Sequence, residues 1–177
     1  MATLLRVAQL GQPILRQNAK PIANIHDHKI QTLIKNLTAT LMDANGVGIG
    51  APQVYESLRL FIVASHPNPR YPNAPQMEPT PMINPKIVSH SKTKTKDWEG
   101  CLSIPGIRGL IPRYTKITIS YTDRHGNKQK KTFENFIARI VEHENDHLDG
   151  IVFLDKVENM KEIITEKEYQ RLMASKK

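Results

Sequence analysis

The five residues from His143 to His147, with the sequence HENDH, constrain the fold of this chain more than any other segment. On an α-helix, residues four positions apart lie on one face, so both imidazoles can reach one metal ion. Glu144 then lies beside the ion, where it can take a proton from a water molecule, an arrangement typical of zinc-dependent hydrolases. The motif therefore predicts a helix with both histidines on one functional face.

The residues before the motif support a buried helix face. Phe136 and Ile140 precede the two histidines at helical spacing, so the histidines continue an apolar stripe. The alternative, a polar helix end with two solvated histidines, would not normally extend such a stripe. Gly150 is a typical stop signal, and we predict a helix from about 135 to 149.

A hydrolytic metal centre also needs a third protein ligand and an open position. The extended pattern HExxHxxGxxH requires histidine at position 153, where the chain has Phe153. Cys101, the only cysteine, is another candidate, although a lone cysteine is more often a small buried hydrophobic residue. A glutamate on a later helix is also possible, but the candidates lie among lysines, as on an exposed helix face: Glu162, Glu166 and Glu168.

The glycine-rich segment from 46 to 53 is the second unusual feature. Its spacing is GxGxG rather than GxGxxG, and no GKS or GKT sequence follows, so a nucleotide or phosphate loop is not indicated. Glycines let a backbone approach another chain closely. We expect a strand edge against which an extended peptide can lie.

Three segments together resemble the signature motifs of the peptide deformylase family. They occur in the family order and at family-like separations: GVGIGAPQ at 46–53, EGCLS at 99–103 and HENDH at 143–147. The segment GQPILR at 11–16 resembles the family's opening, and the similarity extends to about Lys156. Two residues depart from the pattern, because Gly50 stands where alanine is usual and Glu142 where glutamine is usual. The first is expected to loosen its loop, and the second adds negative charge beside a histidine.

The resemblance implies a hydrolase that removes the N-formyl group from the formyl-methionine of newly made polypeptides and releases formate. It implies one divalent metal ion per chain, with Fe²⁺ as the native metal and Zn²⁺ or Ni²⁺ as replacements. Three side chains then hold the ion: Cys101, His143 and His147. Glu144 is the implied general base, and the side-chain amide of Gln53 and the backbone N–H of Leu102 stabilise the oxyanion.

The resemblance also implies a pocket for a methionine side chain. Gly48 and Arg108 match family positions that contact the peptide backbone or its far end. Glu99 is expected either to anchor the loop that bears Cys101 or to bind Arg108. Apolar residues at suitable spacings are candidates for the pocket walls: Val47, Phe136 and Ile140.

Two interpretations from other classes remain open at this level. A metal-dependent endopeptidase would use the same Glu144 in a longer, two-sided cleft, but the motif around Cys101 argues against it. A non-catalytic, basic ribosome-binding module could retain a structural metal, but a structural metal has no need of Glu144.

Length and composition fit a small cytoplasmic enzyme. A chain of 177 residues suits one catalytic domain, from 1 to 177, with a real hydrophobic core. It has no apolar run of about 18 residues, so no membrane span is expected. Its first residues lack the order of a signal peptide, and a single cysteine that binds metal suits a reducing compartment.

The chain is basic, with a formal net charge of +8 and an isoelectric point of about 9.6. The excess can be solvated surface lysine, or it can attract a polyanion, for which the resemblance suggests ribosomal RNA. No motif indicates sequence-specific nucleic-acid binding. Much of the charge lies in three clusters: Lys92, Lys94 and Lys96; Lys128, Lys130 and Lys131; Lys176 and Lys177.

The remaining pattern predicts an α+β chain. An amphipathic helix is expected from Asp27, its cap, to Asn45, with Gly46 ending it. The charged tail from Glu158 is expected to be helical. Strands are predicted at 58–63, 117–121 and 128–133, with a turn at 125–127 and a possible short strand at 151–154.

Seven of the twelve prolines lie between Pro67 and Pro85, which predicts an extended, sheet-free loop. The family resemblance implies small mixed or antiparallel sheets packed around the central HExxH helix, with further helices toward both termini.

Overall fold

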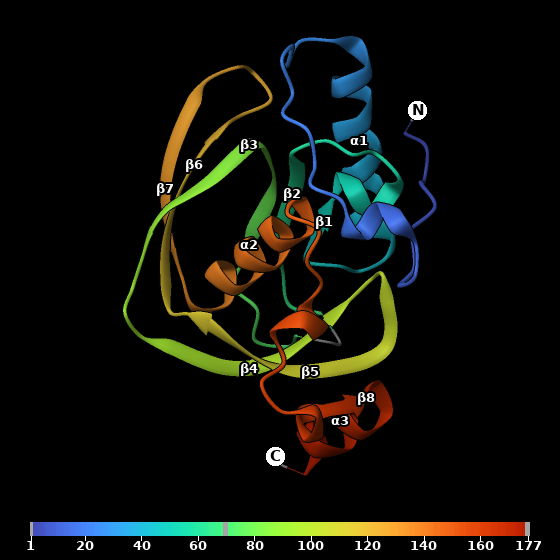
Figure 1. Ribbon diagram of the computed structural model, residues 1–177, viewed down its shortest axis with the longest axis vertical. Coiled ribbons are helices and arrows are strands. Elements are labelled where there is room, and N and C mark those ends of the chain that lie inside the picture. The colour runs from blue at the N-terminus through green and yellow to red at the C-terminus, as the bar shows by residue number, and fades with distance from the viewer. Residues whose placement is uncertain (1, 69–70, 176–177) are drawn as a thin grey trace.

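The computed structural model describes residues 2–68 and 71–175. In this part of the chain it is an α+β fold with three α-helices and two antiparallel sheets, which confirms the predicted class. The helices are α1 (His28–Asp43), α2 (Asn135–Leu148) and α3 (Glu166–Ala174). Figure 1 shows α2 surrounded by the sheets, with α1 and α3 toward opposite ends of the molecule.

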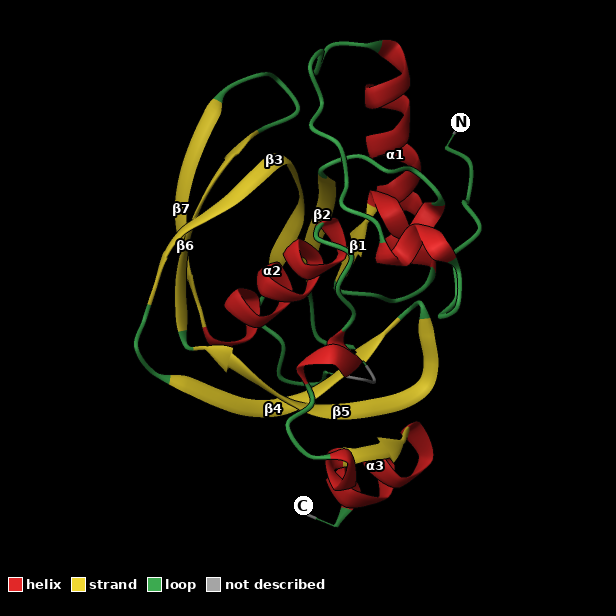
Figure 2. Cartoon of the chain, viewed as in Figure 1, coloured by secondary structure: helices red, strands yellow, loops and turns green. Residues whose placement is uncertain are grey.

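The two sheets have different sizes. The larger has the order β1-β2-β3-β6-β7, with these bounds: β1 (Gly48–Gly50), β2 (Leu60–Ser65), β3 (Met77–His90), β6 (Lys116–Thr122) and β7 (Lys128–Glu134). The smaller has the order β4-β5-β8, with these bounds: β4 (Lys94–Cys101), β5 (Ile104–Tyr114) and β8 (Ile163–Thr165). Figure 2 shows the long β4–β5 pair between α2 and α3.

The core lies on both faces of the larger sheet, because successive side chains of a strand point to opposite faces. In β2, Phe61 and Val63 pack in a buried cluster with residues of α2. Their neighbours Leu60 and Ile62 pack in a second cluster with residues of α1. This two-sided burial makes β2 a continuous apolar run and places α2 firmly against the sheet.

Helix α1 begins as predicted and ends slightly earlier. The Asp27 side chain accepts a hydrogen bond from the Lys29 backbone N–H at 2.8 Å, which caps the helix. The chain leaves the helix through Asn45, which has φ 48, rather than through Gly46. The prediction of Gly46 as the terminating residue is therefore wrong, because asparagine also tolerates the left-handed region.

The proline-rich segment is not sheet-free, which corrects the sequence prediction. Met77–His90 forms β3, with Pro81 opposite Ile62. The first half of β3 pairs with β2 and the second half with β6. Each half therefore has an unpaired edge, where proline's missing N–H removes no ladder hydrogen bond.

The region after α2 also differs from the prediction. The expected strand at 151–154 is absent, and Phe153–Lys156 forms a 3-10 helix, η3. The Asp155 carboxylate accepts from the Val152 backbone N–H at 2.9 Å and closes this turn. The tail from Glu158 is only partly helical, because β8 precedes α3. Three further 3-10 helices complete the elements: η1 (Pro13–Arg16), η2 (Ala51–Val54) and η4 (Met160–Glu162).

None of the described helices is both long and apolar enough to cross a membrane. Lys176 and Lys177 lie outside the described residues.

Candidate active site and metal centre

Three potential metal ligands meet at the end of β4. One ligand atom each from Cys101, His143 and His147 lie within 4.8 Å of one another. The Cys101 Sγ is 3.3 Å from Nε2 of His147, and both histidines are buried. One thiolate and two imidazoles suit Zn²⁺, Fe²⁺ or Ni²⁺ and leave a coordination position open. These residues form the metal-binding group of the protein.

A buried carboxylate lies beside this group. Glu144 is only 3% exposed, and its Oε2 has no hydrogen-bond partner among the described residues. A buried polar atom of this kind needs a donor, and a water molecule in the adjoining cavity would supply one. Burial raises the pKa of Glu144 to about 7, whereas a cation held by the neighbouring histidines would favour its ionised form. The site therefore fits a divalent metal ion with a water beside Glu144.

The imidazole of His143 is oriented from behind by Glu99. Its Nδ1 is 3.0 Å from the Glu99 Oε2, which leaves Nε2 available to a metal. Burial opposes the charge of Glu99, but Arg113 and His143 hold the pKa of this carboxyl well below its ordinary value. Glu99 thus remains an ionised acceptor and fixes the orientation of the His143 ring.

Two arginines surround Glu99. Arg113 on β5 donates to both carboxylate oxygens, at 2.8 Å and 3.0 Å, and to Asp146 at 2.6 Å. Arg139 on α2 donates to Glu99 Oε1 at 2.8 Å and to the Ile111 carbonyl at 2.8 Å. Burial opposes the charge of Arg113, but Glu99 and Asp146 raise its pKa further above the ordinary value. This buried ionic network joins β4 and β5 to α2.

The glycine-rich segment approaches the site as an edge strand, as predicted. β1 is the outermost strand of the larger sheet, next to β2. A Cβ built on Gly48 would lie 2.2 Å from Glu144 Oε1. Only glycine therefore lets β1 pass this close to the carboxylate.

Gln53 is held with its amide nitrogen toward the cysteine. Its Oε1 accepts from the Gly50 backbone N–H at 2.8 Å. Its Nε2 is 3.4 Å from Cys101 Sγ and 3.2 Å from the hydroxyl of Ser103. The amide therefore offers a fixed N–H donor at the edge of the metal-binding group.

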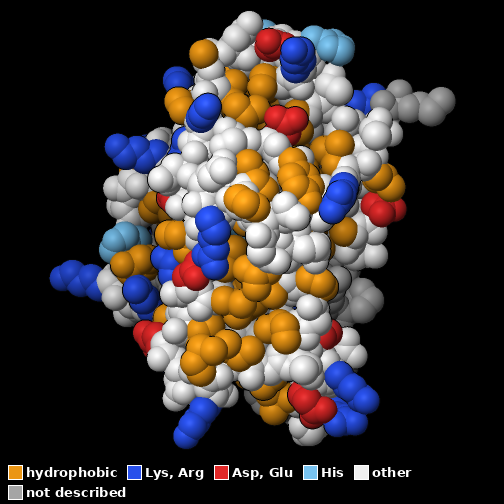
Figure 3. All heavy atoms as spheres, turned by 45° about the vertical axis from the view of Figure 1, so that its right-hand side comes forward, with side chains coloured by type: hydrophobic (Ala, Val, Ile, Leu, Met, Phe, Trp, Pro, Cys, Tyr) orange, Lys and Arg blue, Asp and Glu red, His pale blue; other side chains and the backbone are white. Residues whose placement is uncertain are grey.

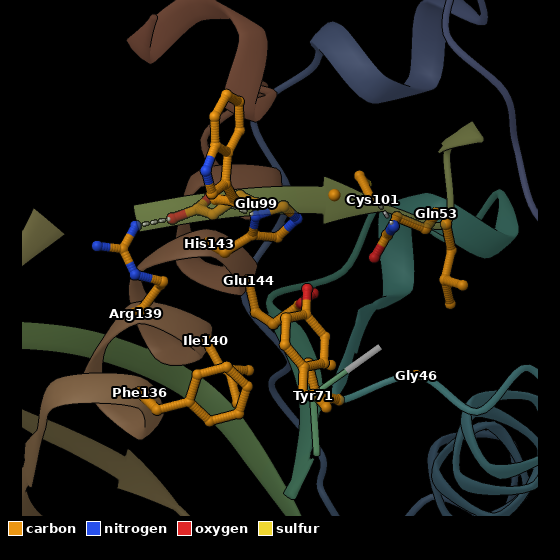
Figure 4. A pocket seen from close by; sticks show the side chains of 15 residues that line it. Gly46, Gln53, Tyr71, Glu99, Cys101, Phe136, Arg139, Ile140, His143 and Glu144 are labelled. Atoms are coloured by element: carbon orange, nitrogen blue, oxygen red, sulfur yellow. Dashed lines mark hydrogen bonds and ion pairs between the residues drawn. The ribbon is translucent and has the colours of Figure 1, made fainter. Parts of the chain in front are cut away.

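An open cavity adjoins the metal-binding group. The three residues predicted as pocket walls all line it: Val47, Phe136 and Ile140. Leu102, Tyr71 and Trp98 add further apolar surface. Figure 4 shows Phe136 and Ile140 on the α2 side, Cys101 and Gln53 on the opposite side, and Tyr71 between them in this view.

Comparison with known proteins decides which family has this combination of fold and site. The family described as polypeptide deformylase matches residues 4–162. The chain belongs to this family. Peptide deformylase 2 from Nostoc sp. is 62% identical over 170 residues, which cover 96% of this chain and 95% of the relative. Peptide deformylase 2 from Shewanella oneidensis is 45% identical over 152 residues, which cover 86% of this chain and 83% of the relative.

Solved deformylase structures share the fold. The class I type b peptide deformylase from Acinetobacter baumannii, solved with Met-Ala-Ser bound, superimposes with a TM-score of 0.87 and 42% sequence identity. The match covers 89% of this chain and 100% of that chain. The fold implied by the sequence resemblance is therefore confirmed.

One expected contact in this deformylase is wrong. Glu99 does not bind Arg108, because Arg113 and Arg139 occupy both its oxygens. Arg108 instead bonds with Glu166, from Nε to Oε2 at 2.6 Å. The loop-anchoring alternative for Glu99 agrees with its position one residue from Gly100 in the cysteine-bearing segment.

The late glutamates are also placed away from the deformylase metal group. Glu166 binds Arg108, Glu162 binds Lys96 at 2.8 Å, and Glu168 binds Arg171. No glutamate from this tail belongs to the metal-binding group of the described residues. The interpretation that used one of them as third ligand is therefore wrong.

Sequence reasoning missed three residues around the deformylase site. Arg139 lies four residues before His143, so helical spacing alone places it on the same face. Arg113 and Tyr71 reach the site from a strand and a loop distant in sequence. No short-range pattern marks either of these two.

Proposed function

We propose that this deformylase hydrolyses the formamide bond of N-terminal formyl-methionine in newly made polypeptides and releases formate. The observation that supports this most directly is the buried Glu144 carboxylate beside a Cys101, His143 and His147 group, at the edge of an apolar cavity. The Acinetobacter baumannii relative was solved with Met-Ala-Ser bound, a peptide that begins with methionine. The cavity of this chain has apolar walls that suit the same side chain.

The metal ion is proposed to be held by the thiolate of Cys101 and the imidazoles of His143 and His147. When bound, it would acidify a water molecule and supply positive charge beside the formyl carbonyl. Fe²⁺ is proposed as the native ion, with Zn²⁺ or Ni²⁺ as replacements.

Glu144 is proposed to move the proton. Its carboxylate takes a proton from the attacking water, whose oxygen forms a bond to the formyl carbon. Glu144 then gives this proton to the nitrogen as the carbon–nitrogen bond breaks. The products are formate and a free amino terminus, so one water is consumed for each bond hydrolysed.

Two donors are proposed to stabilise the charge that develops on the formyl oxygen. The Gln53 amide is fixed by Gly50 and Ser103, so it needs no reorganisation during the reaction. The backbone N–H of Leu102 is the second donor. Leu102 follows Cys101 directly and lines the cavity.

The peptide is proposed to lie along β1. This strand has an unpaired edge, and Gly48 brings its backbone against Glu144. An extended peptide can add to such an edge through main-chain hydrogen bonds. Val47, Phe136 and Ile140 then receive the methionine side chain.

The experiment measures formate release from formyl-Met-Ala-Ser by protein handled without oxygen, together with its metal content. Formate release in proportion to bound metal is expected. Cleavage of an internal peptide bond without formate release would favour the endopeptidase interpretation. Metal-loaded protein that releases neither product would contradict the proposed function.

We further propose that the whole chain acts as one catalytic domain in the cytoplasm and contacts the ribosome surface through basic residues. Lys128, Lys130 and Lys131 are exposed on β7, an edge strand of the larger sheet. Lys96 is less available, because it pairs with Glu162 at 2.8 Å. On the face seen in Figure 3, Lys and Arg side chains are scattered rather than gathered into one patch.

Lysines on an edge strand also prevent edge-to-edge association, and the test below separates this role from ribosome binding. The test replaces Lys128, Lys130 and Lys131 with glutamine and measures sedimentation with ribosomes at several salt concentrations. Weaker, less salt-dependent binding with unchanged hydrolysis of free formyl peptides is expected. Unaltered binding would contradict this ribosome contact.

A further inference from the structure

Helix α3 reaches the wall of the active-site cavity through one buried arginine. The Arg108 guanidinium on β5 donates to Glu166 at the start of α3, with distances of 2.6 Å and 3.1 Å. Its Nη1 donates to the Tyr71 hydroxyl at 2.9 Å. Arg108 is only 1% exposed, so water reaches the salt bridge only from the side of the partly exposed Glu166 carboxylate.

Other contacts fix the guanidinium in this position. A Cβ built on Gly100, the residue before Cys101, would lie 3.1 Å from Arg108 Nε. The Tyr169 ring of α3 lies 4.5 Å from the guanidinium carbon, a cation–π contact. Arg108 is therefore packed between the cysteine-bearing segment and α3.

Pairing between β5 and β8 places Glu166 close to Arg108 along the strand direction. Ile164 on β8 is opposite Arg108, and Glu166 follows two residues later. The segment before β8 is fixed by the ion pair between Glu162 and Lys96 at 2.8 Å. The tail thus presents the Glu166 carboxylate to the arginine from an ordered strand.

Tyr71 is the end of this chain of contacts on the cavity side. Its ring centroid lies 5.0 Å from that of Phe136, and both residues line the cavity. Figure 4 shows Tyr71 beside Phe136 and in front of Glu144. A shift of Tyr71 would therefore change the width of the apolar space beside α2.

We propose that Glu166 is a positioning residue that acts through Arg108 to hold Tyr71 as a specificity-determining wall of the methionine pocket. The inference rests on the proposed function. Arg108 acts here through Tyr71, since its guanidinium already bonds with both Glu166 and the tyrosine hydroxyl. Loss of either contact releases the wall and weakens the preference for a methionine side chain.

The test compares Tyr71→Phe and Glu166→Gln with a matched control, Tyr169→Phe. Each phenylalanine variant keeps its ring, but only the Tyr71 hydroxyl belongs to the contacts that run from Glu166 to the cavity. Metal-loaded proteins are assayed with formyl-Met-Ala-Ser and formyl-Ala-Ala-Ser. The selectivity is the ratio of the two kcat/KM values.

Both Tyr71→Phe and Glu166→Gln are expected to lower this selectivity by roughly threefold to tenfold, the effect of losing one typical intramolecular hydrogen bond. The loss should appear mainly as a higher KM for the methionine peptide, with kcat nearly unchanged. The control should keep the wild-type ratio. The variant that combines Tyr71→Phe with Glu166→Gln should lose no more selectivity than Glu166→Gln alone, because the two residues act through one chain of contacts.

Unchanged selectivity in Tyr71→Phe would overturn this inference, as would an equal loss in the control or additive losses in the double variant. If Glu166→Gln does not fold, Tyr71→Phe and its control decide the question. Wild-type protein that releases no formate would overturn the proposed function as well, whereas active variants with wild-type selectivity would overturn the inference alone.

Discussion

The two glycines of β1 differ in how closely a Cβ added to each would approach the side chains of α2. A Cβ on Gly48 would lie 2.2 Å from Glu144 Oε1 and 2.7 Å from its Cγ. A Cβ on Gly50 would lie 3.5 Å from His147 Cβ and from Pro52 Cδ, the nearest atoms outside the adjacent residues. The first distance is impossible for real atoms and the second is an ordinary contact. The position of Glu144 therefore depends on the absence of a side chain at 48.

Replacing Gly48 with alanine should displace the whole Glu144 side chain. A misplacement of about 1 Å in a catalytic group can cost on the order of 100-fold in rate. We expect kcat/KM to fall by about this factor with metal content unchanged. Gly50→Ala is the matched control, because alanine fits there without a clash, and it should retain nearly wild-type kinetics. Equal activities of the two variants would contradict the assigned position of Glu144.

Glu144→Gln tests the proton transfer itself. Glutamine keeps the size of the side chain but cannot accept the proton, so activity should fall by roughly 100-fold to 10,000-fold. Metal content should stay the same, because the ligand atoms come from other residues: Cys101, His143 and His147. Elemental analysis and formate release on one preparation provide the measurement. Near-wild-type turnover with full metal content would exclude Glu144 as the general base.

The metal-binding residues were predictable from sequence, because two of them share one helical turn and the third lies in a short motif. The salt bridges that hold Glu99 against His143 were only partly predictable. Arg139 shares the helix face of His143, whereas Arg113 faces Glu99 only because β4 and β5 pair. Tyr71 comes from a loop whose path depends on tertiary contacts. Side chains brought together by strand pairing leave no local periodic signal.

The chain turns away from α2 (Asn135–Leu148) at Gly150, a position where two separate constraints favour glycine. Gly150 has φ 71, and a Cβ there would lie 2.7 Å from the carbonyl carbon of Arg16. Gly106 has a similar φ of 77, with no atom within 4 Å of its would-be Cβ. Alanine substitutions at these two glycines therefore distinguish two contributions to the loss of stability. Alanine at 106 has only the left-handed backbone to adopt, whereas alanine at 150 must also avoid the backbone of Arg16.

Gly106→Ala should lower the free energy of unfolding by about 1 kcal/mol, the cost of holding alanine at positive φ. Gly150→Ala should cost more, about 2 to 4 kcal/mol, since Arg16 or the helix end must also move. Chemical denaturation of the metal-loaded proteins measures both. Equal decreases in the free energy of unfolding would mean that the backbone at Arg16 can move aside without destabilising the protein.

Helices were predicted more accurately than strands. The caps and apolar stripes of α1 and α2 are local, so their bounds agree with the prediction to within two residues. Prolines interrupt any alternation in β3, and prolines, glycines and arginines do so in β5. These strands form because β2, β6 and β4 lie beside them, and a local pattern does not contain that pairing. The short strand β8 was missed in a charged tail for the same reason.

The metal-binding group joins two parts of the fold. Cys101 comes from the smaller sheet, and His143 and His147 come from the helix packed on the larger one. A bound ion therefore adds a cross-link between them that the unfolded chain does not have. The identity of the bound ion would then affect reactivity, because metals that share similar ligands differ in their coordination preferences.

Reconstitution of one metal-free preparation with Fe²⁺, Ni²⁺ or Zn²⁺ in the absence of oxygen should give three proteins of different activity. By affinity, the ligand set would take Zn²⁺ over Fe²⁺, so protein made in air should often contain zinc or nickel. Zn²⁺ prefers four ligands and would have to expand its coordination to take a further ligand in this site, whereas Fe²⁺ would accept a fifth ligand more readily. The Fe²⁺ form should therefore have the highest kcat/KM for formyl-Met-Ala-Ser, and air should inactivate it through oxidation at Cys101. Equal or higher kcat/KM for the zinc form would exclude iron as the preferred metal and leave the hydrolytic assignment intact.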